Sequence, residues 1–177
     1  MLQLQCTTSC STSLKEYYRI IYSKTATLFE TSGLVGAISV DADPTKEQAI
    51  REFTYNLGMA FQIKDDILDY EGGEKMGKPS GQDLKEQKIT LPLFGAFASA
   101  EPGKEKEIRS LLCTVTENPS VIGTIISFVK EYGGIAWAEK VLGEWVDKAL
   151  ASLRTFPESK ARTLLEELTL FVSQRSK

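Results

Sequence analysis

The sequence contains no histidine among its 177 residues. This absence excludes nucleophilic sites of the Ser-His-Asp and Cys-His kinds, and it removes the usual ligand of zinc and non-haem iron sites. A metal site in this chain must therefore depend mainly on carboxylates. Carboxylates are hard ligands, and they suit Mg2+ bound together with the phosphates of a substrate.

Other features that are missing narrow the class of protein further. The net charge is −3, so no excess of basic residues points to a nucleic-acid partner. No apolar run approaches the roughly 20 residues that cross a bilayer. The first residues lack the basic start and apolar core of a signal peptide. We therefore expect a cytoplasmic protein without a transmembrane segment and without a nucleic-acid partner.

Cysteine is scarce as well, with Cys6, Cys10 and Cys113 the complete set. An odd count without a CxxC pair favours reduced thiols in a cytosolic protein over a disulfide framework. A length of 177 residues with 42% hydrophobic residues fits one ordinary domain.

Strand patterns are almost absent, and helical periodicity dominates the chain. Short connections between the segments favour antiparallel neighbours. The proline at position 44 suits the start of a helix, and Gly133-Gly134 separates two others. The expected helices cover residues 13–40, 45–71, 89–100, 104–115, 118–132, 134–155 and 158–175.

The most informative segment is residues 61–70, which places three aspartates within five positions beside apolar residues. At about 100° per residue, Gln62, Asp65 and Asp69 share one narrow stripe of a helix, and Asp66 flanks it. Aspartates next to a core face are costly unless a positive group meets them, and a divalent metal carrying a phosphate-type ligand would do so. The alternative is a solvated acidic face, because acidic pairs four residues apart are common on surface helices.

Two further segments contain groups suited to phosphate. Residues 71–83 hold four glycines and two lysines, and Lys88 lies just beyond them. Glycines let backbone approach a ligand closely, and lysines supply mobile charges, although an ordinary exposed loop has the same composition. Upstream, Lys24 precedes Thr25 in a largely apolar segment, where Lys24 either extends to water or points into an anion site.

Together these residues resemble motifs of the trans-isoprenyl (polyprenyl) diphosphate synthase family. Residues 58–69 are similar to the second aspartate-rich motif of that family, and residues 77–92 are similar to the stretch that follows it there. Lys24-Thr25-Ala26 is similar to the family's Lys-Thr motif. The order and spacing of the motifs make the resemblance specific, and it extends over essentially the whole chain.

The resemblance implies an all-α, isoprenoid synthase-type helical bundle. It also implies a prenyl transfer in which an allylic diphosphate ionises and isopentenyl diphosphate attacks the cation. By this resemblance Asp65 and Asp69 would bind Mg2+, and Asp66 would support them. Lys24, Lys78 and Lys88 would contact diphosphate, whereas Thr25 and Gln62 would lie near the developing cation.

The chain also departs from the family, because only the second of its two aspartate-rich motifs is present. Asp41 and Asp43 do not resemble the first. We therefore expect residues 1–177 to correspond to the C-terminal part of a polyprenyl synthetase domain that is inactive alone. We also expect either a homo-oligomer or a missing N-terminal half, and exposed apolar side chains where that half would pack: Leu28, Phe29, Leu57 and Phe61.

Two other functions remain open at this point. The chain could be a non-catalytic partner subunit that completes or regulates a separate synthase chain, although such a subunit would not need the aspartates. An unrelated Mg2+-dependent phosphohydrolase built on a helical bundle is a more distant alternative.

Overall fold

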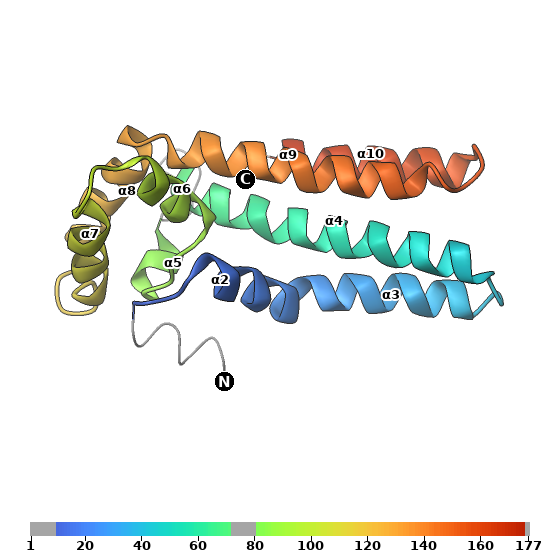
Figure 1. The fold of residues 1–177 in the computed structure, drawn as a ribbon, viewed down its shortest axis with the longest axis horizontal. Helices are drawn as coiled ribbons and strands as arrows, with labels where there is room; N and C mark the ends of the chain where they lie inside the picture. The colour runs from blue at the N-terminus through green and yellow to red at the C-terminus, as the bar shows by residue number, and fades with distance from the viewer. Residues whose placement is uncertain (1–9, 72–80, 176–177) are drawn as a thin grey trace. The chain divides into compact units, whose positions relative to one another are not determined.

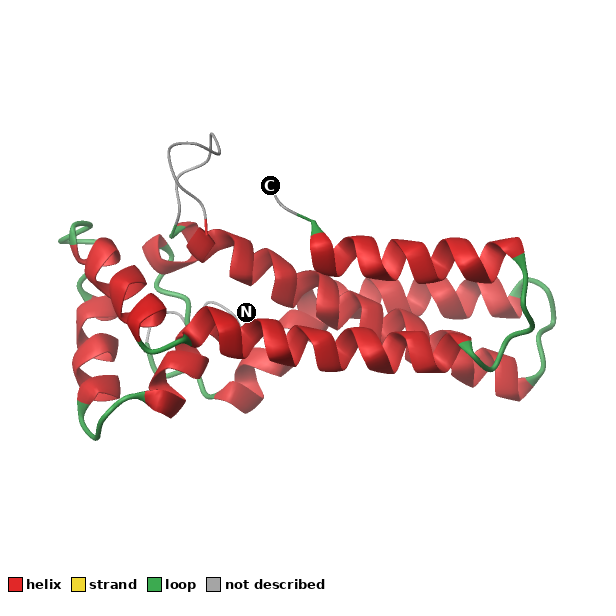
Figure 2. Cartoon of the chain, turned by 90° about the horizontal axis from the view of Figure 1, so that it is seen from above, coloured by secondary structure: helices red, strands yellow, loops and turns green. Residues whose placement is uncertain are grey.

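In the computed structural model, residues 10–71 and 81–175 are described, and all regular structure in these two ranges is helical (Figures 1 and 2). The elements are α2 (Leu14–Ile21), the π-helical turn η1 (Tyr22–Ala26), α3 (Thr27–Ile38), α4 (Pro44–Glu71), α5 (Gln82–Lys85), α6 (Leu91–Ser99), α7 (Lys104–Cys113), α8 (Val121–Glu131), α9 (Gly134–Leu153) and α10 (Lys160–Gln174). Within the described ranges, no helix combines the length and the apolar character needed to cross a bilayer. The all-α prediction is confirmed.

Most of the predicted helices are found where the periodicity places them. The helices expected at 45–71, 104–115 and 134–155 agree with α4, α7 and α9 to within two residues at each end. The expected helix at 13–40 is instead divided into α2, η1 and α3, because residues 22–26 form a π-helical turn. The short helix α5 was not predicted, since its four residues are too few to show a period.

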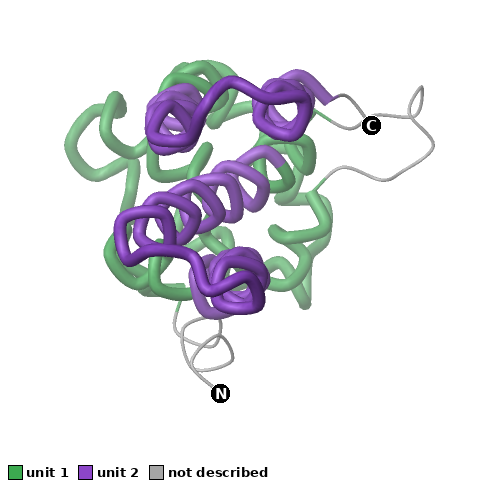
Figure 3. Tube along the Cα trace, turned by 90° about the vertical axis from the view of Figure 1, so that its right-hand side faces the viewer, with its two compact units in different colours: residues 1–20, 65–140, 177 green, residues 21–64, 141–176 purple. Residues whose placement is uncertain are grey.

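The chain divides into two compact units, coloured separately in Figure 3. The first contains residues 1–20 and 65–140, with residue 177, and the second contains residues 21–64 and 141–176. Both α4 and α9 contribute residues to each unit. We refer to these as the first unit and the second unit.

The second unit is a helical bundle, which Figure 3 shows nearly end-on, and it contains η1, α3, most of α4, the later part of α9 and α10. Its core joins Phe53 and Leu57 of α4 to residues of α9 and α10, namely Ala149, Leu153 and Val172. Phe29 and Phe61 are partly buried and pack against this core with ring centroids 5.5 Å apart. Burial of these apolar side chains is the main stabilising contribution within the unit.

One face of α3 stays exposed in the second unit. Leu28, Val35 and Ile38 are 68%, 59% and 55% exposed, and their spacing of seven and three residues places them on one side of the helix. The sequence-based expectation was therefore correct for Leu28. It was wrong for Leu57, which is only 4% exposed because it lies in the core of this unit.

The first unit is organised around α6, whose residues 91–96 are all buried. Gly134, at the start of α9, approaches this helix closely. A Cβ atom at Gly134 would press into the carbonyl oxygen of Pro92 and would lie 3.0 Å from the backbone nitrogen of Ala96. Glycine is required here because only a residue without a side chain lets the two backbones come this near.

A disulfide fastens the beginning of the described chain to α7 in the first unit. Cys10 is bonded to Cys113, and their Cα atoms are 5.9 Å apart. The guanidinium of Arg109 donates to the carbonyl oxygens of Cys10 (3.0 Å) and Thr12 (3.3 Å) and lies over the ring of Phe97. The expectation of reduced thiols is thus wrong for this pair, because the fold brings together two cysteines 103 positions apart.

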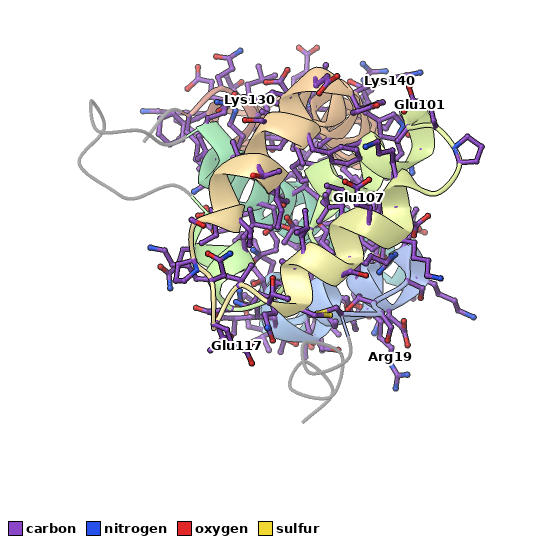
Figure 4. The ribbon with its side chains drawn as sticks, turned by 90° about the vertical axis from the view of Figure 1, so that its left-hand side faces the viewer. Arg19, Glu101, Glu107, Glu117, Lys130 and Lys140 are labelled. Atoms are coloured by element: carbon purple, nitrogen blue, oxygen red, sulfur yellow. A yellow bond between two sulfur atoms is a disulfide. The ribbon has the colours of Figure 1, made fainter. Side chains whose placement is uncertain are left out.

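Charged side chains lie on the face of the first unit seen in Figure 4, among them the exposed Glu101, Glu107 and Lys130. One of these surface carboxylates has an aromatic partner: the hydroxyl of Tyr132 donates to Glu101 at 2.5 Å. This hydrogen bond therefore joins a phenol to a carboxylate at the protein surface.

The close approach at Gly134 yields a stability prediction. Substituting Gly134→Ala should destabilise the protein by about 1–3 kcal/mol, the usual cost of overpacking, because the new methyl meets backbone atoms that cannot rotate away. The midpoint and slope of urea unfolding, followed by circular dichroism, measure this change.

Gly143, further along α9, supplies the matched control. A Cβ atom there meets no described atom within 4 Å. Gly143→Ala should therefore leave stability unchanged or raise it by roughly 0.5–1 kcal/mol, the helix-propensity gain of alanine over glycine. Equal stability of the two variants would contradict the close packing inferred at Gly134.

Candidate functional site

The acidic residues singled out from the sequence lie in the last two turns of α4, in the first unit. Asp66 and Asp69 are only 3% and 7% exposed, whereas Asp65 is half-buried. A fully solvated acidic face, the alternative left open by the sequence, is therefore excluded for two of the three aspartates. Buried carboxylates need hydrogen-bond donors, and the structure supplies them from two directions.

The first donor is the phenol of Tyr17 in α2. Its hydroxyl donates to Oδ2 of Asp66 at 2.8 Å, and the tyrosine itself is 2% exposed. Burial, followed by the negative charge of Asp66, raises the pKa of Tyr17 well above its ordinary value. The phenol therefore stays protonated and remains a donor at physiological pH.

The second set of donors is the backbone at the start of α5. The amide of Gln82 donates to Oδ1 of Asp69 at 3.0 Å, and the amide of Asp83 donates to Oδ2 at 3.0 Å. The amide of Gly81 also donates to the backbone carbonyl of Asp69 at 2.9 Å. Asp69 thus attaches residues 81–83, at the start of α5, to the end of α4.

Two of the candidate lysines, Lys78 and Lys88, belong to the first unit. Lys78 lies outside the described residues. Lys88 forms ion pairs with Asp83 (3.2 Å) and Glu86 (2.5 Å). Burial alone would lower the pKa of Lys88, but the hydrogen bond with Glu86 and the charge of Asp83 outweigh it and raise this pKa. Lys88 is therefore a cation that carboxylates hold in place.

The remaining candidates, Lys24, Thr25 and Gln62, belong to the second unit. Lys24 and Thr25 lie in the π-helical turn η1, and Lys24 is exposed. The hydroxyl of Thr25 donates to the side-chain carbonyl of Gln62 at 2.7 Å. The structure thus brings together two residues that are 37 positions apart and that the resemblance had assigned to the same role. π-Helical turns inside α-helices occur frequently at functional sites.

Gly58 explains how η1 can approach α4. A Cβ atom at this position would lie 2.7 Å from Cα of Ala26 and 3.1 Å from Cβ of Phe29. A larger residue would therefore push the turn away from α4 and lengthen the contact between Thr25 and Gln62. Backbone of the Lys-Thr segment therefore occupies the space beside Gly58.

The three aspartates fit Mg2+ only together with other ligands. Among residues 10–71 and 81–175, no group of three or more acidic, cysteine or histidine side chains is close enough to hold a metal. Mg2+, however, usually takes one or two protein carboxylates and completes its shell with water and substrate phosphates. A carboxylate oxygen has two lone pairs, so accepting one hydrogen bond does not by itself prevent it from binding a metal. The residues present are thus compatible with Mg2+ bound together with a diphosphate.

Two structural features, one in each unit, were missed by the sequence analysis. Nothing in the residue pattern distinguishes Tyr17 from its neighbour Tyr18, because a hydroxyl contact between distant segments leaves no periodic signal. The π-helical turn was missed because it changes the local register without changing composition. The polar pair Lys24 and Thr25 within an apolar segment, and its similarity to the family's Lys-Thr motif, pointed to the region but not to the turn itself.

Comparison with known proteins gives one consistent result. The family profile described as polyprenyl synthetase matches residues 1–129. The octaprenyl diphosphate synthase of Escherichia coli K12 is 33% identical over 100% of this chain and 55% of its own length. The heptaprenyl diphosphate synthase component 2 of Geobacillus stearothermophilus is 33% identical over 92% of this chain and 50% of its own length.

A solved structure agrees with these matches. The polyprenyl synthase of Caulobacter crescentus CB15, crystallised with calcium and isoprenyl diphosphate, superimposes with a TM-score of 0.88 and 34% identity. The match covers 99% of this chain and 54% of that one. The chain therefore spans about half the length of the relatives that it matches. With a helical fold, an acidic motif at the end of α4 and a profile match over most of its length, the chain belongs to the polyprenyl synthetase family.

Proposed function

We propose that this chain provides the second aspartate-rich side of a prenyl-transferring active site. The reaction is the condensation of an allylic diphosphate with isopentenyl diphosphate, with release of diphosphate. The observation that carries the proposal is the placement of the family's motif residues: Asp66 and Asp69 are held by specific donors, and Thr25 is paired with Gln62.

Asp65, Asp66 and Asp69 are the residues that would hold Mg2+. When bound, the metal would neutralise negative charge on the departing diphosphate. Among the three aspartates, Asp65 is the most accessible, whereas both oxygens of Asp69 also accept backbone amides. We therefore assign Asp65 chiefly to metal binding and Asp69 to both metal binding and the local fold.

The basic and polar residues take complementary roles in this proposal. Lys24, Lys78 and Lys88 would bind diphosphate oxygens, and for Lys88 this requires exchanging its ion pairs with Asp83 and Glu86. The hydrogen bond from Thr25 directs the side-chain carbonyl of Gln62. A fixed, uncharged oxygen of this kind can stabilise a developing carbocation without reacting with it.

The exposed face of α3 fits a contact with further protein. Leu28, Val35 and Ile38 of this face are each more than half exposed. Exposed apolar patches of this kind commonly mark protein–protein contacts. Because the chain spans about half the length of its relatives, we propose that this face binds the other part of a synthase.

A second candidate function is that of a partner subunit in a heteromeric synthase. One relative is named as a component of its synthase, which favours this alternative. The same α3 face would then contact the other component. The aspartates distinguish the two cases, because a purely structural subunit would not need them to bind a metal.

The role of Asp65 leads to a binding prediction. Asp65→Asn should weaken Mg2+-dependent binding of inorganic diphosphate by at least about tenfold, equivalent to ~1.4 kcal/mol, and should leave the thermal midpoint unchanged. Isothermal calorimetry with and without Mg2+ measures the affinity. Asp147→Asn, which alters an exposed aspartate of α9, is the control and should bind like the unaltered chain.

Asp69→Ala should behave differently from Asp65→Asn. Removing this carboxylate leaves the amides of Gln82 and Asp83 without their acceptor, which should cost about 1–3 kcal/mol of stability. If Asp65→Asn binds diphosphate as tightly as the Asp147 control, the assignment of the metal to this motif is wrong.

The proposal also predicts that the 177-residue chain alone has no measurable prenyltransferase activity. The sequence contains only one aspartate-rich motif, and acceleration depends on charges fixed on both sides of the reacting diphosphate. Adding the separately expressed part of the Escherichia coli relative that this chain does not cover should restore some activity. Incorporation of labelled isopentenyl diphosphate measures it. Efficient elongation by the purified chain alone would refute the prediction.

The α3 face can be tested in the same mixture. The double substitution Val35→Ser and Ile38→Ser should weaken the association of the two parts by at least about tenfold, because it removes apolar area that the contact would bury. Leu164→Ser with Leu168→Ser on α10, which are 54% and 47% exposed, is the matched control. Sedimentation velocity of each chain alone also reveals whether copies of the chain associate instead. An unchanged affinity for the α3 variant would remove this face from the proposal.

A further inference from the structure

The contact between Tyr17 and Asp66 joins two segments that are 49 positions apart in the chain. Both side chains are almost completely buried, and the hydroxyl-to-carboxylate distance is 2.8 Å. A buried hydrogen bond to a charged acceptor is among the stronger ones in proteins. Tyr17 lies outside the motifs that resemble the family, yet its hydroxyl touches a motif residue directly.

The position of Tyr17 is itself fixed from several sides. Its ring packs against Phe94 and Tyr18, with centroids 5.8 Å and 5.4 Å away. At the start of α2, the backbone amide and hydroxyl of Ser13 both donate to Glu16, at 2.8 Å and 2.7 Å. These contacts hold the phenol in place, so its hydroxyl is aimed at Asp66 before any ligand is bound.

We propose that Tyr17 is a positioning residue for the aspartate-rich motif. Its hydroxyl occupies one oxygen of Asp66 and fixes the orientation of the carboxylate. The orientation of the carboxylate in turn sets the direction in which its other oxygen points. Because Tyr17 belongs to α2, the affinity of the motif for a divalent metal with diphosphate then depends on this helix. Groups that orient a metal-binding carboxylate commonly change the affinity by 10–100-fold when they are removed. The inference rests on the proposed function of the motif.

The first unit contains a natural comparison for this contact. Tyr132 donates to Glu101 with the same chemistry, but Glu101 lies on the exposed surface and outside the motif (Figure 4). Tyr17→Phe and Tyr132→Phe therefore each remove one phenol–carboxylate hydrogen bond and keep the ring. Only the first should affect the motif.

The experiment measures the binding of Mn2+ in the presence of inorganic diphosphate. Isothermal calorimetry, in which Mn2+ with diphosphate is titrated into the protein and into a protein-free blank, gives the affinity, so the readout does not require catalysis. We expect Tyr17→Phe to weaken binding about tenfold, the lower end of the effect known for such supporting residues. Tyr132→Phe should stay within about twofold of the unaltered chain, well below the tenfold change that 1.4 kcal/mol represents. All titrations are made well below the thermal midpoint of each variant.

The possible results separate the inference from the proposed function. If the unaltered chain binds Mn2+ and Tyr17→Phe binds equally well, Tyr17 supports the fold only and the inference is overturned. The same conclusion holds if both phenylalanine variants weaken binding alike, or if Tyr17→Phe loses its helical circular dichroism signal. If the unaltered chain binds no Mn2+ with diphosphate, the proposed function of the motif fails and the inference fails with it.

Discussion

The first unit depends on the burial of carboxylates at the end of α4. Asp66 and Asp69 are removed from water, and an ionised carboxylate there must find donors or become unfavourable. The donors come from the phenol of Tyr17 and from the amides at the start of α5. The acidic motif therefore fixes the segments on either side of it, because α2 and α5 must both reach these two side chains. The aspartate-rich motif, which the sequence predicts to bind a metal, therefore also holds α2 and α5 against α4.

In the second unit, a glycine and not a charged residue determines how two segments pack together. Gly58 lets the backbone of η1 lie against α4, and this approach allows Thr25 to reach Gln62. The π-helical turn then carries Lys24 and Thr25 at a point where the helical register changes. Hydrogen bonds thus fix the aspartates of the first unit, whereas close backbone packing at Gly58 fixes the Thr25–Gln62 pair of the second.

Much of this could be predicted from the sequence because helices and motifs leave regular spacing. The all-helical fold, the start of α4 near Pro44 and the grouping of Asp65, Asp66 and Asp69 all follow from positions along the chain. Contacts between distant segments leave no such spacing, which is why Tyr17 and the Cys10–Cys113 pair were not found. Leu57 was misplaced for a related reason, since its partners in α9 and α10 are 92 or more positions away. The binding of Mg2+ and the roles of the lysines stay predictions.

The disulfide has a consequence for the integrity of the chain. Joined at Cys10 and Cys113, the polypeptide between them forms a closed covalent ring that contains α2 to α7, and with them the aspartates and the Lys-Thr turn. A single cut by a protease within that ring would open it without releasing a fragment. Such a nicked molecule would migrate as one species until a reductant separated its two pieces, so a single band on a non-reducing gel is no proof of an intact backbone.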